Sequence, residues 1–234
     1  MIKNIVSVAA AFLGAGMLMT GCNFDQPSAG CIVQDASFAN WFAKYDLKEG
    51  QNISSDCQAK IIKGETVGVF KFTDPEKANS SVLTIRPRGL YSRAARDPGD
   101  PYLQTAVGKL SDTTDAQDFC SATDFSAASV NAGASSSEAA TTITYQFENV
   151  KVYSAPDAPG TQLSGDLTYT RDNCTAQYTV RAIWPATPCD PESSKPADLC
   201  GEGSGINPDF AVECDAGLGI CVPSKPIPSF KIDR

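Results

Sequence analysis

The chain has 234 residues, with 27 acidic and 19 basic side chains, nine cysteines, no histidine and a net charge of −8. This acidic balance argues against nucleic-acid binding, because nucleic acid is held by Lys and Arg side chains that neutralise phosphates. The missing histidine excludes Ser-His-Asp and Cys-His catalysis and any metal site that needs an imidazole.

Residues 1–21 have the composition of an export signal. Lys3 gives a short positive start, and Ile5 to Met19 is apolar or small with no charge. This run of about fifteen residues is too short for a bilayer-spanning helix, which needs ~20, and has the length of a secretory h-region. We therefore predict a signal peptide and export by the Sec route.

The end of this run reads Met19-Thr20-Gly21-Cys22, which resembles the bacterial lipobox. The resemblance implies cleavage between Gly21 and Cys22 and attachment of acyl chains such as palmitate to Cys22. Two or three chains, at ~0.8 kcal/mol per buried CH₂, give a stable lipid anchor. By the same resemblance, Asn23 rather than Asp after the lipidated cysteine implies the outer membrane.

The cysteines that follow Cys22 form an even set in an exported chain, which predicts a disulfide framework. They are Cys31, Cys57, Cys120, Cys174, Cys189, Cys200, Cys214 and Cys221. Zinc sites favour C-x₂₋₄-C pairs, and no pair here is spaced so closely, so we expect no metal and no cofactor. Sequence leaves the connectivity open; we prefer Cys31–Cys57 and Cys120–Cys174, with the last four cysteines paired among themselves.

Four aromatic residues near the start of the mature chain recur at i, i+3, i+4 and i+7. They are Phe38, Trp41, Phe42 and Tyr45. This spacing predicts a short helix, which Asp35 or Ser37 would cap. We expect its aromatic face to pack into the core, in preference to forming a ligand site.

From Ile61 onward the hydrophobic period changes to two. Strands are predicted at 65–72, 80–87, 141–153, 162–170 and 177–184. A slip in the alternation at Glu148-Asn149 predicts a bulge. Turns at Pro156 to Gly160 and at Asp172-Asn173 join the last three strands into an antiparallel meander. We therefore predict a mainly β fold: an antiparallel β-sandwich or barrel-like domain.

Two stretches lack this alternation. Residues 126–142 contain fourteen Ser, Ala, Gly or Thr out of seventeen, which predicts a mobile loop that buries little surface. The Cys- and Pro-rich C-terminal part predicts a disulfide-stapled, loop-rich appendage. The predicted organisation is a signal peptide at 1–21, a lipidated tether at 22–30, a β-rich domain at 31–187 and an appendage at 188–234.

No motif singles out a catalytic residue. The chain has no S-x-x-K, no phosphate-binding P-loop and no dinucleotide fingerprint. One alternative that stays open is an envelope hydrolase that uses an Asp/Glu pair on glycans. Another is a calcium-dependent adhesion module based on Asp112, Asp115 and Asp118, because calcium prefers oxygen ligands.

One basic cluster stands out in the acidic chain. It consists of Arg86, Arg88, Arg93 and Arg96. Arginines bind phosphate or sugar acids through two parallel hydrogen bonds, so the cluster could hold groups of an outer-membrane glycolipid. The interpretation we favour is that these arginines pair with some of the surplus acids.

Several segments resemble the small cysteine-rich outer-membrane lipoproteins of gliding deltaproteobacteria, the MlpA type. They are the lipobox, "FANW" at 38–41, "LTYT" to "CTAQY" at 167–178 and "GSGINPDFAVECD" at 203–215. The resemblance implies a lipid-anchored protein on the surface or facing the periplasm, and it supplies no catalytic residue. We predict a non-enzymatic binding or structural role, with the membrane held through Cys22 and an envelope protein or glycan as partner.

Overall fold

The computed structural model describes residues 30–73, 81–195 and 199–232, without the side chains of 37–39. The predicted signal peptide, with Gly21, and the predicted lipidation site Cys22 lie outside these residues. In the described part of the chain, no helix is both long enough and apolar enough to cross a bilayer.

The fold is mainly β and antiparallel, as predicted. The strands are β1 (Ala36–Leu47), β2 (Gly64–Thr73), β3 (Ser81–Pro87), β4 (Ala106–Leu110), β5 (Phe119–Thr123), β6 (Ala128–Ala132), β7 (Thr141–Ala155), β8 (Ala158–Arg171), β9 (Cys174–Ile183), β10 (Val212–Asp215) and β11 (Ile220–Pro223). The short helices are α2 (Ser55–Gln58) and α3 (Arg88–Tyr91), with single 3₁₀ turns η2 (Ala94–Arg96) and η3 (Pro101–Gln104).

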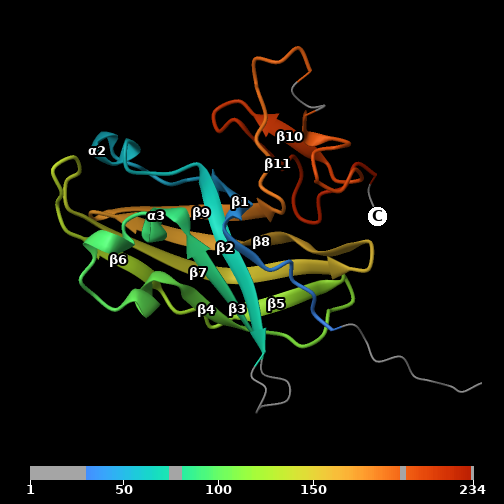
Figure 1. Cartoon of the computed structure of the whole chain (residues 1–234), viewed down its shortest axis with the longest axis horizontal. Helices are drawn as coiled ribbons and strands as arrows, with labels where there is room; N and C mark the ends of the chain where they lie inside the picture. Colours follow the sequence, from blue (N-terminus) through green and yellow to red (C-terminus); the bar gives the residue numbers. More distant parts are fainter. Residues whose placement is uncertain (1–29, 74–80, 196–198, 233–234) are drawn as a thin grey trace, which may run out of the picture.

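Nine of these strands form one sheet in the order β5-β4-β3-β2-β1-β9-β8-β7-β6. β5 also pairs with β7, so the sheet closes on itself as a barrel. β6 pairs with the first half of β7 and β5 with its second half. The long strands β7, β8 and β9 run side by side across the molecule, and α3 lies at one end of the barrel (Figure 1).

Side chains fill the inside of the barrel. Alternate residues of β7 and β9 are buried, as the period of two requires. The largest side chains with less than 2% exposure include Trp41, Tyr145, Tyr169 and Tyr178. One internal cavity, bordered by Tyr45 and Phe147, measures about 10 Å³. A space of this size holds at most about one water molecule, so this cavity cannot accept an organic ligand.

The C-terminal part packs on the outside of the barrel as a separate lobe around the β10–β11 hairpin (Figure 1). Phe42 of β1 packs with Ile220 and Val222 of β11. The fully buried Gln162 amide of β8 accepts a hydrogen bond from Ser229 N at 2.7 Å and donates to Ser229 O. Because both apolar and polar contacts join the lobe to β1 and β8, it covers part of the outer barrel surface.

The helix predicted from the aromatic spacing is wrong, because residues 36–47 form strand β1. Trp41 and Tyr45 point into the barrel core, as a strand period of two allows. Phe42 points outward and is buried there by the C-terminal lobe. A strand that is buried on both faces has apolar residues at both odd and even positions. Here Trp41 and Tyr45 on one face and Phe42 on the other together give the i, i+1, i+4 spacing that is typical of a helix.

The loop predicted at 126–142 is only partly correct. It contains β6 at Ala128–Ala132 and reaches the start of β7, and a loop remains between them. Ala128, Val130 and Ala132 are each 1% exposed or less. Small side chains fit here because β6 pairs closely with β7 and is buried. The abundance of small residues in β6 therefore reflects strand packing and not a loop.

The sequence did not predict β4, β5, β10 and β11, but it did predict the irregularities of the long strands. The register of β7 against β8 shifts between Glu148 and Lys151, and Asn149 has φ +51°, which confirms the predicted bulge. Asp172 and Asn173 both have positive φ in the tight turn between β8 and β9. The turn predicted at Pro156 to Gly160 is narrower, because β8 already begins at Ala158.

All eight cysteines after Cys22 are in disulfides, but the first two preferred pairs are wrong. The bonds are Cys31–Cys120, Cys57–Cys174, Cys189–Cys214 and Cys200–Cys221. The two wrong pairs join cysteines that are closer in sequence. Closure of the sheet instead brings together cysteines 89 and 117 positions apart. Cys31 N donates to Asp112 O at 3.0 Å, which holds the first segment beside the strand that leads to Cys120.

Candidate functional site

One glutamate lies inside the barrel wall. Glu65 is in β2 opposite Ala43 of β1, in the same phase as the buried Val67 and Val69. It therefore points toward the barrel axis, at the end that α3 covers. A carboxylate in this position needs hydrogen-bond donors, because removal from water penalises its charged form.

Three donors converge on the Glu65 carboxylate. Its Oε1 accepts from Tyr145 Oη at 2.7 Å and from Tyr45 Oη at 3.3 Å. Its Oε2 accepts from the Gly89 backbone N at 2.5 Å. A Cβ at Gly89 would lie 2.3 Å from Tyr145 Oη, so the close approach of α3 requires glycine. This arrangement closes the end of the barrel with satisfied polar groups.

Burial changes the acidity of these groups. It raises the pKa of Glu65 above its ordinary value, although the three donors and the nearby Arg93 oppose the shift. Burial, and then Glu65 itself, raises the pKa of Tyr145 and of Tyr45 well above 10. Burial also raises the pKa of Tyr169 to about 12. All three tyrosines therefore keep their protons at neutral pH, and Tyr145 and Tyr45 donate theirs to Glu65.

A hollow of about 220 Å³ opens next to this cluster. Its lining includes Glu65, Arg88, Arg93, Tyr145, Tyr169 and Arg171, and we call it the Glu65 pocket. Arg88 and Arg93 come from α3 and the residues after it, and Arg171 ends β8. Tyr145 and Tyr169 pack edge to face with ring centres 5.0 Å apart. The pocket therefore combines guanidinium groups with aromatic surface.

The structure divides the four arginines of the basic cluster. Arg88 and Arg93 line the Glu65 pocket. Arg96 forms an ion pair with Glu138, as the favoured interpretation predicted for the cluster. Arg86 donates to the Gln104 amide oxygen at 3.0 Å. The predicted pairing with an acidic residue is therefore confirmed for Arg96. Arg88 and Arg93 are instead available to the Glu65 pocket.

The predicted calcium residues do not converge. Asp115 Oδ1 accepts from the backbone N of Gln117 and of Phe119, at 2.9 Å each, and so shapes a turn. Among described residues, the cluster whose possible ligand atoms lie within 4.8 Å of one another consists of Cys189, Cys200 and Cys221. These sulfurs are in disulfides, so they are not thiolate ligands as the chain stands.

A carboxylate pair for hydrolysis also needs two acids at one hollow. In the described lining of the Glu65 pocket, Glu65 is the one acid. A second hollow of about 330 Å³ lies at the bulge of β7 and has both Asp124 and Glu148 in its lining. Asp124 is exposed and pairs with Lys109 at 3.0 Å. The Glu65 pocket therefore lacks a carboxylate pair of the kind glycosidases use, and in the second hollow Asp124 is already paired with Lys109.

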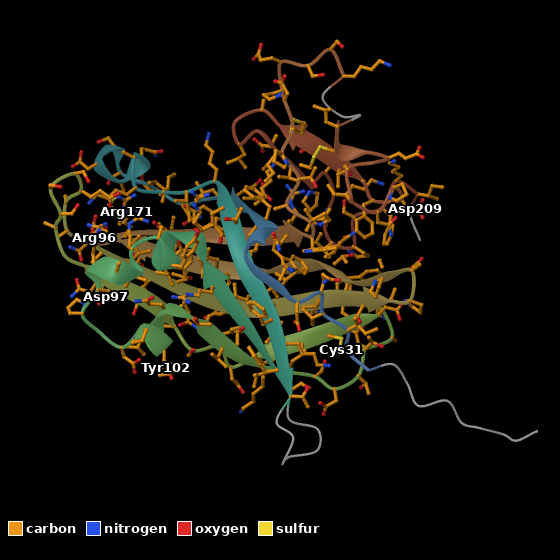
Figure 2. The ribbon with its side chains drawn as sticks, viewed as in Figure 1. Cys31, Arg96, Asp97, Tyr102, Arg171 and Asp209 are labelled. Carbon is orange, nitrogen blue, oxygen red and sulfur yellow. A yellow bond between two sulfur atoms is a disulfide. The ribbon has the colours of Figure 1, made fainter. Side chains whose placement is uncertain are left out.

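The Glu65 pocket and the first described residues lie at opposite ends of the barrel. Figure 2 places Arg171, Arg96 and Asp97 at one end of the molecule and Cys31 at the other. The register agrees: Ile143 pairs with Arg171, whereas Val152, seven residues after Tyr145 on β7, pairs with Cys120, the partner of Cys31. The predicted lipidation site, Cys22, precedes Cys31 by nine residues.

Sequence reasoning missed Glu65, Tyr145, Tyr169 and Arg171 as members of one site. A usable signal existed in "ETVGVF", where Glu65 occupies the same phase as Val67 and Val69. A charged residue in the buried phase of a strand indicates a specific partner or function. Its partners come from β1, β7 and α3, and their proximity follows from barrel closure.

Comparison with known proteins gives one consistent result. The profile of the MlpA family matches residues 39–185. A Myxococcus xanthus protein with the name "Putative lipoprotein MlpA" is 45% identical over 239 aligned positions, which cover 99% of this chain and 100% of the relative. No solved structure matches.

Proposed function

Because the chain belongs to the MlpA family, whose Myxococcus xanthus relative is named as a lipoprotein, we propose that it is an outer-membrane lipoprotein with a binding role. In this proposal the signal peptide is removed before Cys22, acyl chains on Cys22 anchor the chain, and the barrel holds the Glu65 pocket away from the bilayer. The partner is a molecule of the cell envelope.

The observation that carries the proposal is the opposite placement of Cys31 and the Glu65 pocket. Nine residues extend by at most about 30 Å, so an anchor at Cys22 keeps the Cys31 end nearest the membrane. A strand of fifteen residues, the length of β7, spans about 50 Å. The pocket end is then the part of the barrel that reaches farthest from the lipid surface.

The attachment of Cys31 supports a mechanical role for that end. The Cys31–Cys120 disulfide links the anchored segment to β5. Ile32 N donates to Ser154 Oγ at 2.8 Å, and Gln34 N donates to Gly160 O at 2.9 Å. A pull on the tether is therefore transmitted directly to β5, β7 and β8.

The first test is the intact mass of the detergent-extracted protein, measured before and after reduction and alkylation. The proposal predicts a chain that starts at Cys22, carries acyl chains, and exposes eight thiols only after reduction. Cys22→Ser is the matched variant and should leave the membrane fraction. An unacylated Cys22 that alkylates without reduction would contradict the anchor.

The choice of membrane is tested separately. The sorting rule implied by the lipobox resemblance retains proteins with Asp after the lipidated cysteine in the inner membrane. Asn23→Asp should therefore keep the acyl chains but move the protein from the outer to the inner membrane fraction. Density-gradient separation of the two membranes measures this shift. An unchanged distribution would remove the argument from Asn23, whereas an inner-membrane location of the unaltered protein would contradict the proposed outer-membrane location.

A further inference from the structure

Three guanidinium groups meet in the lining of the Glu65 pocket. Arg88 is the first residue of α3, Arg93 follows that helix, and Arg171 is the last residue of β8. Arg171 is far from the other two arginines in sequence, and closure of the barrel end brings it to them. In a chain with 27 acids and 19 basic residues, cations gathered at one hollow contrast with the overall charge.

These arginines retain unused hydrogen-bonding capacity. Among the described residues, Arg88 has no side-chain hydrogen bond or ion-pair partner, and its side chain is exposed. Arg93 donates from Nη1 to Gly89 O at 2.9 Å, but its buried Nε has no acceptor. Arg171 Nε is also buried, and Asp172 Oδ2 at 3.9 Å is too far for a hydrogen bond. Buried donors without acceptors are costly and indicate a missing partner.

The pocket is electrostatically positive even though it contains a glutamate. With Glu65 ionised, the three guanidinium groups and one carboxylate sum to 3 − 1 = +2. The Glu65 oxygens are already occupied by Tyr145, Tyr45 and Gly89, so the carboxylate does not satisfy the arginines. Asp172 is shared with Lys60, whose Nζ lies 3.8 Å from Oδ2. A ligand with two negative charges would match the remaining charge.

Size and apolar surface narrow the ligand further. The pocket measures about 220 Å³, and Ile62, Ile143, Tyr145 and Tyr169 contribute its apolar and aromatic lining. Such a volume accommodates an anionic group with one small ring, below the size of a typical drug-sized ligand. Aromatic side chains offer flat surface to the ring, while guanidinium groups bind phosphate oxygens in pairs.

From these observations, and resting on the proposed binding role, we propose that the Glu65 pocket binds a phosphate monoester carried on a small ring such as a sugar. Arg88, Arg93 and Arg171 hold the phosphate oxygens, and Ser92 at the rim offers a hydroxyl. The same group occurs on soluble sugar phosphates and on phosphorylated glycolipid headgroups, so the shared chemistry is the monoester phosphate.

The test is calorimetric titration of the full-length lipidated protein in neutral detergent with glucose 6-phosphate. Glucose is the uncharged control and glucuronate the singly charged control. Because each charge-assisted contact contributes about 1.5–3 kcal/mol, Arg88→Gln should weaken glucose 6-phosphate binding about tenfold or more. Arg93→Gln should weaken it similarly, provided that its melting temperature shows a folded chain.

Lys109→Gln is the matched control. It removes one positive charge from a side chain that is 78% exposed and outside the Glu65 pocket. Unchanged binding in Lys109→Gln together with a loss in Arg88→Gln supports the proposal. Equal losses in the two variants, or no loss in Arg88→Gln, would overturn it, because binding would then reflect general charge or another surface.

Two further outcomes separate this inference from the binding role on which it rests. Equal affinity for glucuronate and glucose 6-phosphate, both lost in Arg88→Gln, would overturn the phosphate assignment but keep the pocket as a binding site. No binding of any of the three probes would overturn the phosphate inference, while envelope crosslinks at the pocket would still support the binding role.

A competition experiment with vesicles identifies the source of the phosphate group. Competition by vesicles of phosphatidic acid, but not of the diester phosphatidylglycerol, would identify the lipid-borne source. The absence of competition would identify the soluble source.

Discussion

The two ends of the barrel are stabilised by different interactions. At the Cys31 end a disulfide and backbone hydrogen bonds fasten the first segment to β5, β7 and β8. At the Glu65 end, the carboxylate of Glu65 in β2 accepts hydrogen bonds from tyrosines of β1 and β7, and arginines line the hollow beside it. One end is fastened covalently, and polar groups stay accessible at the other. In the proposed arrangement, this difference separates attachment from binding.

Removing the long-range disulfides should give the largest effects. Cys31–Cys120 and Cys57–Cys174 join residues 89 and 117 positions apart. In the chain-entropy description each contributes about 4–5 kcal/mol to the free energy of unfolding. We expect C31S/C120S and C57S/C174S to lose comparable stability in guanidinium titrations. Only C57S/C174S should weaken glucose 6-phosphate binding, because Cys174 pairs across the turn with Arg171. A loss of binding in folded C31S/C120S protein would contradict the independence of the two barrel ends.

The next largest effect concerns Gly160 at the Cys31 end. It has φ +66°, and a Cβ there would lie 2.2 Å from Ile32 O. Gly160→Ala should therefore lower the free energy of unfolding by about 3 kcal/mol, from left-handed backbone strain plus displacement of the first segment. Gly50→Ala is the matched control, since Gly50 has φ +78° but open space around it, and it should cost about 1–2 kcal/mol. Equal losses would show that contact with the first segment contributes nothing.

At the Glu65 end, Tyr145→Phe should have a smaller effect on stability. It removes the 2.7 Å donor from a partly buried carboxylate while keeping the ring packed against Tyr169. We expect a loss of about 1–3 kcal/mol in the free energy of unfolding, measured by urea titration. Tyr169→Phe serves as the comparison, because no hydrogen bond joins its hydroxyl to Glu65 among those described; a larger loss there would contradict the central role of Tyr145.

The smallest effect should appear in the pH dependence. Because burial raises the pKa of Glu65, its contribution to stability is present below the unfolded-state pKa and is lost as pH rises through the folded-state pKa. Glu65→Gln does not titrate, so the stability of the unaltered protein relative to Glu65→Gln should fall as the pH rises above the ordinary range of a glutamate. Glu49→Gln, at an exposed position, provides the control. A difference that grows with pH would reverse the assigned direction.

The local features of the sequence predicted five of the eleven described strands, namely β2, β3, β7, β8 and β9. The last three were readable because they are buried on one face along most of their length. β1 was misassigned since Phe42 is buried by the C-terminal lobe, a contact that no local pattern reveals. Residues 128–132 were misassigned because their small side chains suit close strand packing as well as loops.

Long-range geometry explains the other differences. The pairing of Cys31 with Cys120 and the gathering of Arg88, Arg93 and Arg171 both depend on closure of β5 onto β7. Periodicity indicates strands and turns but not which edges meet. Within the site, the position of Glu65 in a buried phase was readable from the sequence, whereas its donors Tyr145 and Gly89 were not.

The proposed separation of attachment from binding is tested most directly by hydrogen exchange of the lipidated protein in lipid nanodiscs, compared with the Cys22→Ser variant. We predict slower exchange on membrane attachment at 31–35 and 112–118, near Cys31, with no change at 88–93 and 169–172 around the Glu65 pocket. Slower exchange at 88–93, with the Cys31 end unchanged, would place the pocket against the bilayer and contradict the arrangement.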